Sequence, residues 1–182
     1  MEIGKTRYFL NRDEWRAWLA KNHDKASELW LITYKKHTGK KSLPYNDAVE
    51  EALCYGWIDS IVKRLDDDRT VQRYSPRRPK SNLSETNKER IRRLIDNKRM
   101  TKVGLAKVRH LMDEPFEVPS DILAAIKKDK EAWRHYQSFP ESYKRVRIGW
   151  IEGARNRPEV FRTRLSYFIR MTAKNSKYGM VR

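Results

Sequence analysis

The sequence contains few of the residues that mark secreted, membrane-spanning or metal-binding proteins. It has a single cysteine, Cys54, which excludes an intramolecular disulfide framework and suits a reducing cytoplasm. No run approaches the roughly 20 apolar residues of a membrane-spanning helix, and no signal-peptide pattern opens the chain. The histidines are scattered, without a His or Cys pair at zinc-ligand spacing. We therefore expect a cytoplasmic protein with no membrane span, metal site or cofactor; its oligomeric state cannot be read from the sequence.

Common catalytic fingerprints are also missing. Residues 37–41 (HTGKK) resemble the end of a phosphate-binding loop, but the first glycine of that motif would fall at Tyr34, and no Ser or Thr follows Lys40. Neither a nucleophile elbow nor a dinucleotide-binding fingerprint occurs. The sequence thus names no reaction, and whether the protein is an enzyme stays open.

Acidic residues are scarce relative to basic ones. The 182 residues include 41 Lys and Arg against 24 Asp and Glu, a net charge of +17. The excess lies in residues 73–109, with thirteen bases and three acids, and in residues 144–182, with eleven bases and two acids. Such clustering is typical of an anion-binding face, although a solvated helix surface has the same appearance. An anionic small molecule or a nucleic-acid backbone is therefore the expected partner.

The chain has enough bulky residues to build a core, with 38% hydrophobic and 11% aromatic residues. Its periodicity predicts a helix over 11–21 capped by Asn11, a strand over 28–36 buried on both faces, and a helix over 45–56. Strands over 57–64 and 69–75 form an expected hairpin around the acidic turn 65–68. In the first of these strands, alternation places Asp59 with Trp57 and opposite Val62.

Helices dominate the rest of the sequence. Ser84 and Thr101 are expected to cap helices to about Lys98 and Met112, with Ile91, Leu94 and Ile95 facing inward. The segment 113–119 (DEPFEVP) is expected to link a core domain, residues 1–114, to a helical extension, residues 115–182. In this extension Ser120, Asp129 and Asn156 are expected as caps, and Pro140 and Pro158 in first helical turns. The predicted fold is α+β: a small, mostly antiparallel sheet with packed helices, followed by an all-helical C-terminal part.

Two groups of residues could carry chemistry. The first surrounds the end of the helix 45–56, whose apolar side leaves Glu50, Glu51 and Cys54 on or near the other side. Carboxylates beside Trp57 can have raised pKa values, so Glu51 and Asp59 are candidate general acids or bases. The alternative is that these acids are structural ion-pair partners of the many bases. Cys54 is interpreted as a small buried residue, because nearby acids would raise its pKa.

The second group is the segment 73–84 (RYSPRRPKSNLS), which combines stiff prolines, bases and a helix start. Arg73, Arg77, Lys80 and Ser81 are expected to contact an anion, because guanidinium groups and a free helix N-terminus favour phosphate or carboxylate. Tyr55 and Trp57 are expected to form the wall of that pocket. The alternative is a rigid connector whose bases pair with Asp59 and the turn 66–68. The helices over 84–98 and 101–112 could also form a helix-turn-helix, although their joint lacks glycine.

Three segments carry a resemblance to a known family. They are residues 34–36 (YKK), 48–60 (AVEEALCYGWIDS) and 75–81 (SPRRPKS), followed by residues 99–100, 104–106, 139–143 and 150–151. The chain resembles the bacterial YdeI/OmpD-associated family, whose members are also described as bacteriocin-protection proteins. The resemblance implies a small cytoplasmic α+β protein with a helical C-terminal half, and a link to bacteriocin or envelope-stress tolerance. Near positions 97 and 98, the resemblance implies a small residue or glycine, and this sequence has Asn97-Lys98 instead.

These observations lead to one main hypothesis and two rivals. The main hypothesis is a non-enzymatic protein that binds an anionic ligand or nucleic-acid backbone. The first rival is a hydrolase or transferase that acts on an anionic substrate through Glu51 or Asp59. The second is a stress-linked interaction protein that docks through its C-terminal helices.

Overall fold

The computed structural model describes residues 2–79, 81–113 and 115–179. The chain divides into two compact units, residues 1–81 with 91–112 and residues 82–90 with 113–182. The sequence-based boundary after residue 114 remains a prediction. Each unit is described separately.

The first unit is built on a four-stranded sheet in the order β1-β2-β4-β3. The strands are β1 (Thr6–Tyr8), β2 (Leu29–Tyr34), β3 (Trp57–Arg64) and β4 (Arg69–Pro76). β1 pairs with β2 in parallel, and β2–β4 and β4–β3 are antiparallel. The sheet and the helices together confirm the predicted α+β class. They also confirm the hairpin, because β3 and β4 flank the acidic turn.

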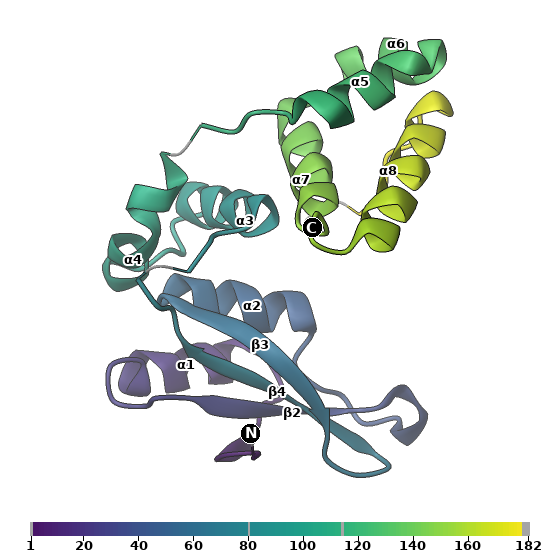
Figure 1. Ribbon diagram of the computed structural model, residues 1–182. Helices are drawn as coiled ribbons and strands as arrows, with labels where there is room; N and C mark the ends of the chain where they lie inside the picture. The colour runs from purple at the N-terminus through teal and green to yellow at the C-terminus, as the bar shows by residue number, and fades with distance from the viewer. Residues whose placement is uncertain (1, 80, 114, 180–182) are drawn as a thin grey trace. The chain divides into compact units, whose positions relative to one another are not determined.

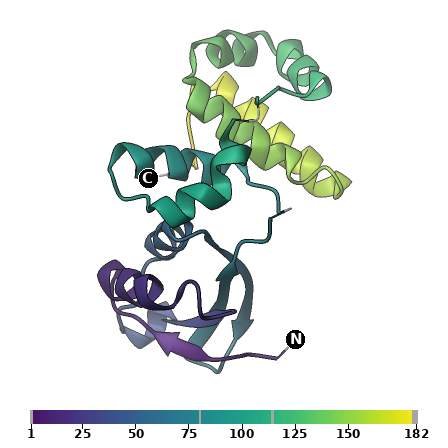
Figure 2. The same cartoon turned by 90° about the vertical axis from the view of Figure 1, so that its left-hand side faces the viewer.

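Two helices, α1 (Arg12–Asn22) and α2 (Tyr45–Cys54), lie against one face of this sheet (Figures 1 and 2). Asn11 caps α1 as predicted, since its side chain accepts hydrogen bonds from the backbone of Asp13 and Glu14. Trp15 fixes α1 to α2 by donating its indole N–H to the Ala48 carbonyl at 3.0 Å. A short 3-10 turn, η1 (Lys36–Thr38), follows β2.

Indole rings fill the space between the helices and the sheet. Trp15 stacks on Trp18 and meets Trp57 and Tyr74 edge-on. Only the first half of β2 is buried, so the expectation that this strand is covered on both faces along its length is wrong. The reason is that the helices do not extend over its second half, where Thr33 is exposed.

Strand β3 contains an irregularity that the sequence did not reveal. Asp59 lies opposite Tyr74 and Val62 opposite Gln72, so three steps on β3 match two steps on β4. This is a β-bulge, and it places Asp59 and Val62 on the same face. The predicted strict alternation, with Asp59 and Val62 on opposite faces, is therefore wrong beyond Asp59.

Helix α4 (Lys102–Met112) approaches the end of α2 closely. A Cβ atom on Gly104 would lie 2.2 Å from the Cys54 carbonyl oxygen, so only glycine fits at this position. Thr101 caps α4, as predicted, because its hydroxyl accepts from the Gly104 N–H at 3.1 Å. That hydroxyl also donates to the Cys54 carbonyl. Thr101 and Gly104 thus fix α4 against the C-terminus of α2.

Helix α3 (Glu85–Asp96) contributes to both units, since residues 82–90 are part of the second unit and 91–112 of the first. Ser84 caps it as predicted, accepting from the Asn87 N–H at 3.3 Å. Ile91 and Leu94 are buried as expected, but Ile95 is 41% exposed, so its predicted inward position is wrong. At the end of the helix Lys98 adopts a left-handed conformation with φ of 54°.

The second unit contains α5 (Ser120–Lys128), α6 (Lys130–Ser138), α7 (Glu141–Glu152) and α8 (Pro158–Ala173). Its core is formed by residues from all four helices and the α6–α7 junction: Ile122, Ile126, Ala132, Tyr136, Phe139, Tyr143, Ile148, Ile151 and Phe168. This arrangement confirms the predicted helical C-terminal part. Among the described residues, no helix combines the length and the apolar character needed to cross a membrane.

The predicted caps of these helices are partly correct. Asp129 caps α6, and Pro158 is in the first turn of α8. Ser120 is instead the first residue of α5, Pro140 is the N-cap of α7, and Arg157 takes the N-cap position expected for Asn156. Each of these helices starts one residue away from the expected position because a proline at the boundary, with its fixed φ, determines where the helix begins.

Candidate functional site

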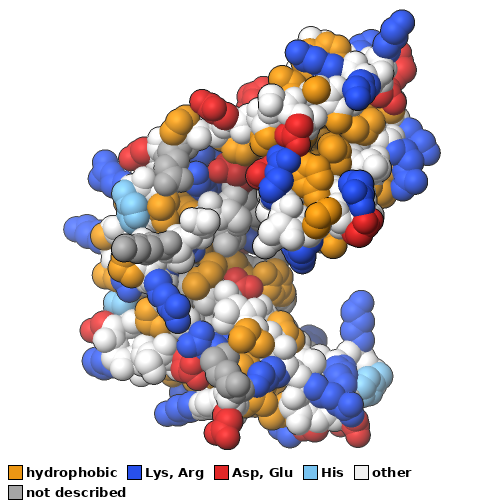
Figure 3. All heavy atoms as spheres, viewed as in Figure 1, with side chains coloured by type: hydrophobic (Ala, Val, Ile, Leu, Met, Phe, Trp, Pro, Cys, Tyr) orange, Lys and Arg blue, Asp and Glu red, His pale blue; other side chains and the backbone are white. Residues whose placement is uncertain are grey.

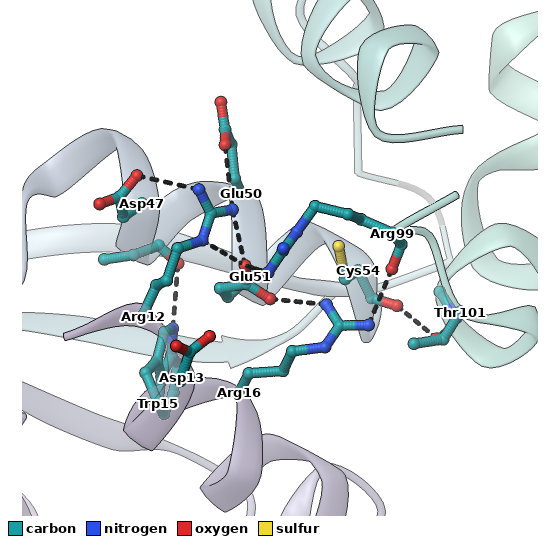
Figure 4. Close-up of polar contacts among 12 residues, drawn as sticks. Arg12, Asp13, Trp15, Arg16, Asp47, Glu50, Glu51, Cys54, Arg99 and Thr101 are labelled. Carbon is teal, nitrogen blue, oxygen red and sulfur yellow. Dashed lines mark hydrogen bonds and ion pairs between the residues drawn. The ribbon is translucent and has the colours of Figure 1, made fainter. Parts of the chain in front are cut away.

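The clearest cluster of charged residues in the first unit surrounds Glu51. Arg12 and Arg16, four residues apart on α1, project from the same side of that helix toward α2. Arg99 reaches the same point from the turn before α4, so three guanidinium groups converge on one carboxylate (Figure 4). The cluster joins three segments of the chain that are far apart in sequence.

The Glu51 carboxylate is fully buried and accepts a hydrogen bond from each arginine. The distances are 2.8 Å from Arg12 Nε, 2.6 Å from Arg16 Nη1 and 2.6 Å from Arg99 Nη2. Arg12 also pairs with Asp47 at 3.2 Å and with Glu50 at 3.3 Å. Glu51 is buried because these arginines cover the side of α2 on which it lies.

These contacts determine the ionisation of Glu51. Burial alone would raise its pKa, but the hydrogen bonds from Arg16, Arg12 and Arg99 outweigh burial and hold the pKa below its ordinary value. Glu51 is thus an ionised carboxylate with its oxygens already occupied, which is unsuited to general acid or base chemistry. The cluster fits the structural ion-pair alternative.

Cys54 lies one turn after Glu51 on α2 and is buried. Burial and the negative charge of Glu51 raise the pKa of its thiol to about 11, although Arg16 acts in the opposite direction. At neutral pH the thiol is protonated and a poor nucleophile. This agrees with the interpretation of Cys54 as a small buried residue.

Asp59, the second candidate acid or base, lies apart from the Glu51 cluster on β3. Its Oδ2 accepts from the Tyr45 hydroxyl at 3.0 Å and from Gln72 Nε2 at 2.9 Å. Both donors line a small cavity of about 150 Å³ between the sheet and the start of α2. Asp59 therefore lies near a pocket whose lining contains two phenols, Tyr45 and Tyr74, but no carboxylate, imidazole, amine or thiol.

The expected anion contacts at residues 73–81 are largely engaged within the protein. Arg73 donates from Nε to Glu28 at 2.5 Å, and Glu28 in turn has a lowered pKa because Trp30 and Arg73 hydrogen-bond to it. Arg77 is buried, which lowers its pKa, and its Nη2 donates to the Ser81 carbonyl at 3.0 Å. The Ser81 hydroxyl donates to the Arg78 carbonyl at 2.8 Å. Lys80 lies outside the described residues.

The two expected wall residues belong to the core. Trp57 has no exposed surface and donates its indole N–H to the His23 carbonyl at 3.0 Å. Tyr55 is 9% exposed and packs against the ring of His23, with the Arg16 guanidinium above it. The segment 73–81 thus resembles the connector alternative, and its role as a ligand site remains a prediction.

A group of bases in the second unit was not singled out from the sequence beyond its excess of charge. Arg147, on α7, is 7% exposed and lies over the rings of Trp150 and Tyr178, at 5.2 and 5.1 Å from their centroids. Arg164, on α8, stacks on Trp150 at 4.3 Å. The i,i+3 spacing of Arg147 and Trp150 was the available signal, since these positions share a helix face.

Arg147, Arg157 and Arg164 lie near enough to one another that their positive charges interact. Burial, followed by repulsion from Arg157 and Arg147, lowers the pKa of Arg164. Among the described residues, no carboxylate pairs with Arg147, Arg157 or Arg164. An uncompensated group of this kind favours the approach of an anion. In the same part of the chain, no three His, Cys, Asp or Glu side chains form a group that could hold a metal ion.

Comparison with family models assigns the two parts of the chain differently. Residues 7–107, more than half of the chain, match a domain of unknown function, DUF8412. Residues 115–175 match the family described as "Bacteriocin-protection, YdeI or OmpD-Associated", which confirms the resemblance and places it in the helical C-terminal part. The motifs at residues 48–60 and 75–81 lie within the first match. No curated protein and no solved structure matches the chain.

Proposed function

The chain belongs to the DUF8412 family and carries a YdeI/OmpD-associated region, and on this premise we propose that it binds polyanions, with a nucleic-acid backbone as ligand, and catalyses no reaction. A role of this binding in tolerance to bacteriocins or envelope stress is part of the proposal. This part rests on the description of the second family alone.

The observation that supports the proposal is the set of bases in the second unit that lack a carboxylate partner. In residues 144–179, ion pairs occupy four bases: Lys144, Arg145, Arg155 and Arg162. No carboxylate pairs with six others among the described residues: Arg147, Arg157, Arg164, Arg170, Lys174 and Lys177. Bases whose N–H groups are not committed to a carboxylate remain able to bind phosphate oxygens.

Several of these bases are held in place by aromatic rings. Arg170 lies over Tyr167 at 5.2 Å, and Lys177 over Phe139 at 5.9 Å. Stacking restrains a guanidinium group without neutralising it, which reduces the entropy lost when an anion binds. Phosphate contacts of this type recognise charge and spacing, not base sequence.

The catalytic alternative has less support. Glu51 is ionised and saturated with hydrogen bonds, and Cys54 has a pKa raised to about 11. Asp59 is hydrogen-bonded by an amide and a phenol. Among the described residues, neither carboxylate has a second carboxylate or an imidazole as a hydrogen-bond partner with which it could share acid and base roles.

A matched pair of triple variants tests the proposal. The first replaces Arg157, Arg170 and Lys174 with glutamine, and the second replaces Arg134, Arg155 and Arg162, which are also exposed but pair with carboxylates. Both variants lose the same charge, so long-range attraction changes equally. Anisotropy with a labelled single strand of about 20 nucleotides, measured across a salt series, compares their affinities.

We expect the first variant to bind at least about tenfold more weakly, with a salt slope reduced by about 2 for three lost phosphate contacts. The second variant should keep the wild-type slope. Equal losses in the two variants would show that only net charge matters. Failure of the wild-type protein to bind at all would refute the proposed function.

A further inference from the structure

The second unit contains a surface pocket whose lining combines apolar side chains with an arginine. It has a volume of about 390 Å³ and is lined by Trp150 of α7 and by Glu159, Val160, Thr163, Arg164 and Tyr167 of α8. Pockets that hold small molecules usually measure roughly 300–1,000 Å³ and have mostly apolar walls with a few polar groups. In Figure 3, hydrophobic side chains gather over α7 and α8, with Lys and Arg side chains beside them.

Arg164 is the polar group of this pocket that is held most firmly. Its Nη1 donates to the Trp150 carbonyl at 2.5 Å, and its guanidinium lies 4.3 Å from the centroid of the Trp150 ring. These two contacts fix the guanidinium at the wall while leaving its charge without a carboxylate partner among the described residues. A ligand with one negative group would relieve the cost of that half-buried charge.

Arg147 supplies a second positive charge behind the same aromatic wall. Its side chain is almost fully buried, and its Nε has no hydrogen-bond partner among the described residues. Arg147 and Arg164 both stack on Trp150, so two cations contact the same indole. A buried charge without a counter-ion is costly unless another charge compensates it, and an anion in the pocket would do so.

Glu159 is the single carboxylate in the pocket lining, and it does not neutralise Arg164. It pairs with Arg162, one turn along α8, and its side chain is 84% exposed. The remaining walls, Trp150, Val160 and Tyr167, are apolar or aromatic. A strongly hydrated ion such as free phosphate gains little from such walls, whereas an apolar body attached to a carboxylate gains from both features.

We infer that this pocket binds a small apolar carboxylic acid, with the carboxylate on Arg164 and the apolar body between Trp150, Val160 and Tyr167. The inference shares Arg147 and Arg164 with the bases of the proposed polyanion binding, but it also requires the apolar walls of the pocket, which that proposal does not need. The affinity of ligands for surface bases falls steeply as the salt concentration rises. The interaction of Arg164 with an acid enclosed by apolar walls is screened much less.

The experiment uses three probes on the full chain at about 0.5 M salt, where exposed charges are screened. They are 3-phenylpropionate, the neutral 3-phenylpropanol, and inorganic phosphate. Nuclear magnetic resonance of the Trp150 indole N–H reports binding, and the indole of Trp133 in the same unit serves as the reference. We expect phenylpropionate to shift the Trp150 signal in a saturable way and to bind at least about tenfold more tightly than either other probe.

Two variants locate the site. Arg164→Gln removes the charge, and Val160→Phe fills the pocket without changing any charge; each should weaken phenylpropionate binding by at least about tenfold. Lys174→Gln, at the end of the same helix and outside the pocket lining, should bind as the wild type does. Equal binding of phosphate, or undiminished binding by Val160→Phe, would overturn the inference. Because Val160→Phe leaves the surface bases intact, it should still bind the labelled strand, so the two proposals can fail separately.

Discussion

Two groups of arginines, one in each unit of this protein, have different kinds of partner. In the first unit, three arginines converge on the buried carboxylate of Glu51, and Arg73 pairs with Glu28. In the second unit, Arg147 and Arg164 stack on the faces of Trp150 and have no carboxylate partner among the described residues. Carboxylates neutralise the first group of arginines, whereas aromatic rings hold the second group without neutralising it, although other arginines of the second unit, such as Arg155 and Arg162, do pair with carboxylates.

This difference limits what can be inferred from the net charge of the two basic stretches. By residue count, residues 73–109 and 144–182 carry nearly the same excess of positive charge. A guanidinium bound to a carboxylate offers little to a ligand, whereas one stacked on a ring keeps its N–H edges available. The net charge of a stretch therefore does not show which of its guanidinium groups can bind a ligand; the partners of each group do.

The largest expected effect comes from breaking the Glu51 cluster. Glu51→Gln leaves three guanidinium groups around a neutral amide, and removing one partner of a buried ion pair typically costs about 3–5 kcal/mol. We expect a loss of this size in the free energy of unfolding of the first unit. Hydrogen exchange measured separately for α2 and α8 shows whether the loss is confined to the first unit.

The matched control is Glu50→Gln. Glu50 precedes Glu51 on α2 but contacts only Arg12, at 3.3 Å, among the arginines of the cluster. Its replacement should cost less than about 1 kcal/mol, as is usual for a partly exposed pair. If both variants lose the same stability, or if Glu51→Gln leaves α2 exchange unchanged, the cluster does not hold the first unit together.

The two units should also differ, by a smaller amount, in how their stability depends on acidic pH. The pKa of Glu51 is lower in the folded state than in the unfolded state. The ionised carboxylate therefore contributes fully to the free energy of unfolding above the unfolded pKa of about 4.3, and this contribution is lost as the pH falls through the folded pKa. Asp121 in the second unit also has a lowered pKa from its hydrogen bonds with Arg155, but it is exposed to solvent, where such pairs contribute little.

We therefore expect the first unit to lose stability before the second as pH falls below about 4. Circular dichroism combined with unit-resolved hydrogen exchange measures the two transitions. In Glu51→Gln this acid-dependent loss should be smaller in the first unit, because the amide does not titrate, while Glu28, whose pKa is also lowered, still does. An unchanged acid transition in that variant would assign the sensitivity to other carboxylates.

Local signals in the sequence were sufficient for much of the fold. Asn11 and Thr101 lie where capping rules place them, and the acidic turn correctly predicted the hairpin of β3 and β4. Such features depend on residues within one or two turns of each other. The bulge after Asp59 was not predicted, because it depends on which residues of β4 lie opposite.

The sites were harder to predict for the same reason. Glu51 was noticed as one of several acids, but its partners lie 35–48 residues away, and no local pattern identifies them. Trp57 was expected to line a pocket, yet its indole N–H finds the His23 carbonyl, 34 residues away, and the ring is fully buried. Net charge located the second basic stretch, but the absence of carboxylate partners is a property of three-dimensional packing.

The smallest expected effect concerns the turn that carries Arg99 to Glu51. Lys98 has a φ of 54°, a left-handed conformation that costs a residue with a Cβ roughly 1–2 kcal/mol, whereas glycine adopts it freely. Glycine also gives up more backbone freedom on folding, so Lys98→Gly should stabilise the first unit by only about 0.5 kcal/mol. Urea unfolding measures the gain. Lys98→Ala removes the same charge but keeps a Cβ, so it should give no gain. If alanine stabilises as much as glycine, relief of charge repulsion and not of backbone strain is responsible, and the first unit then also contains bases that are not fully compensated.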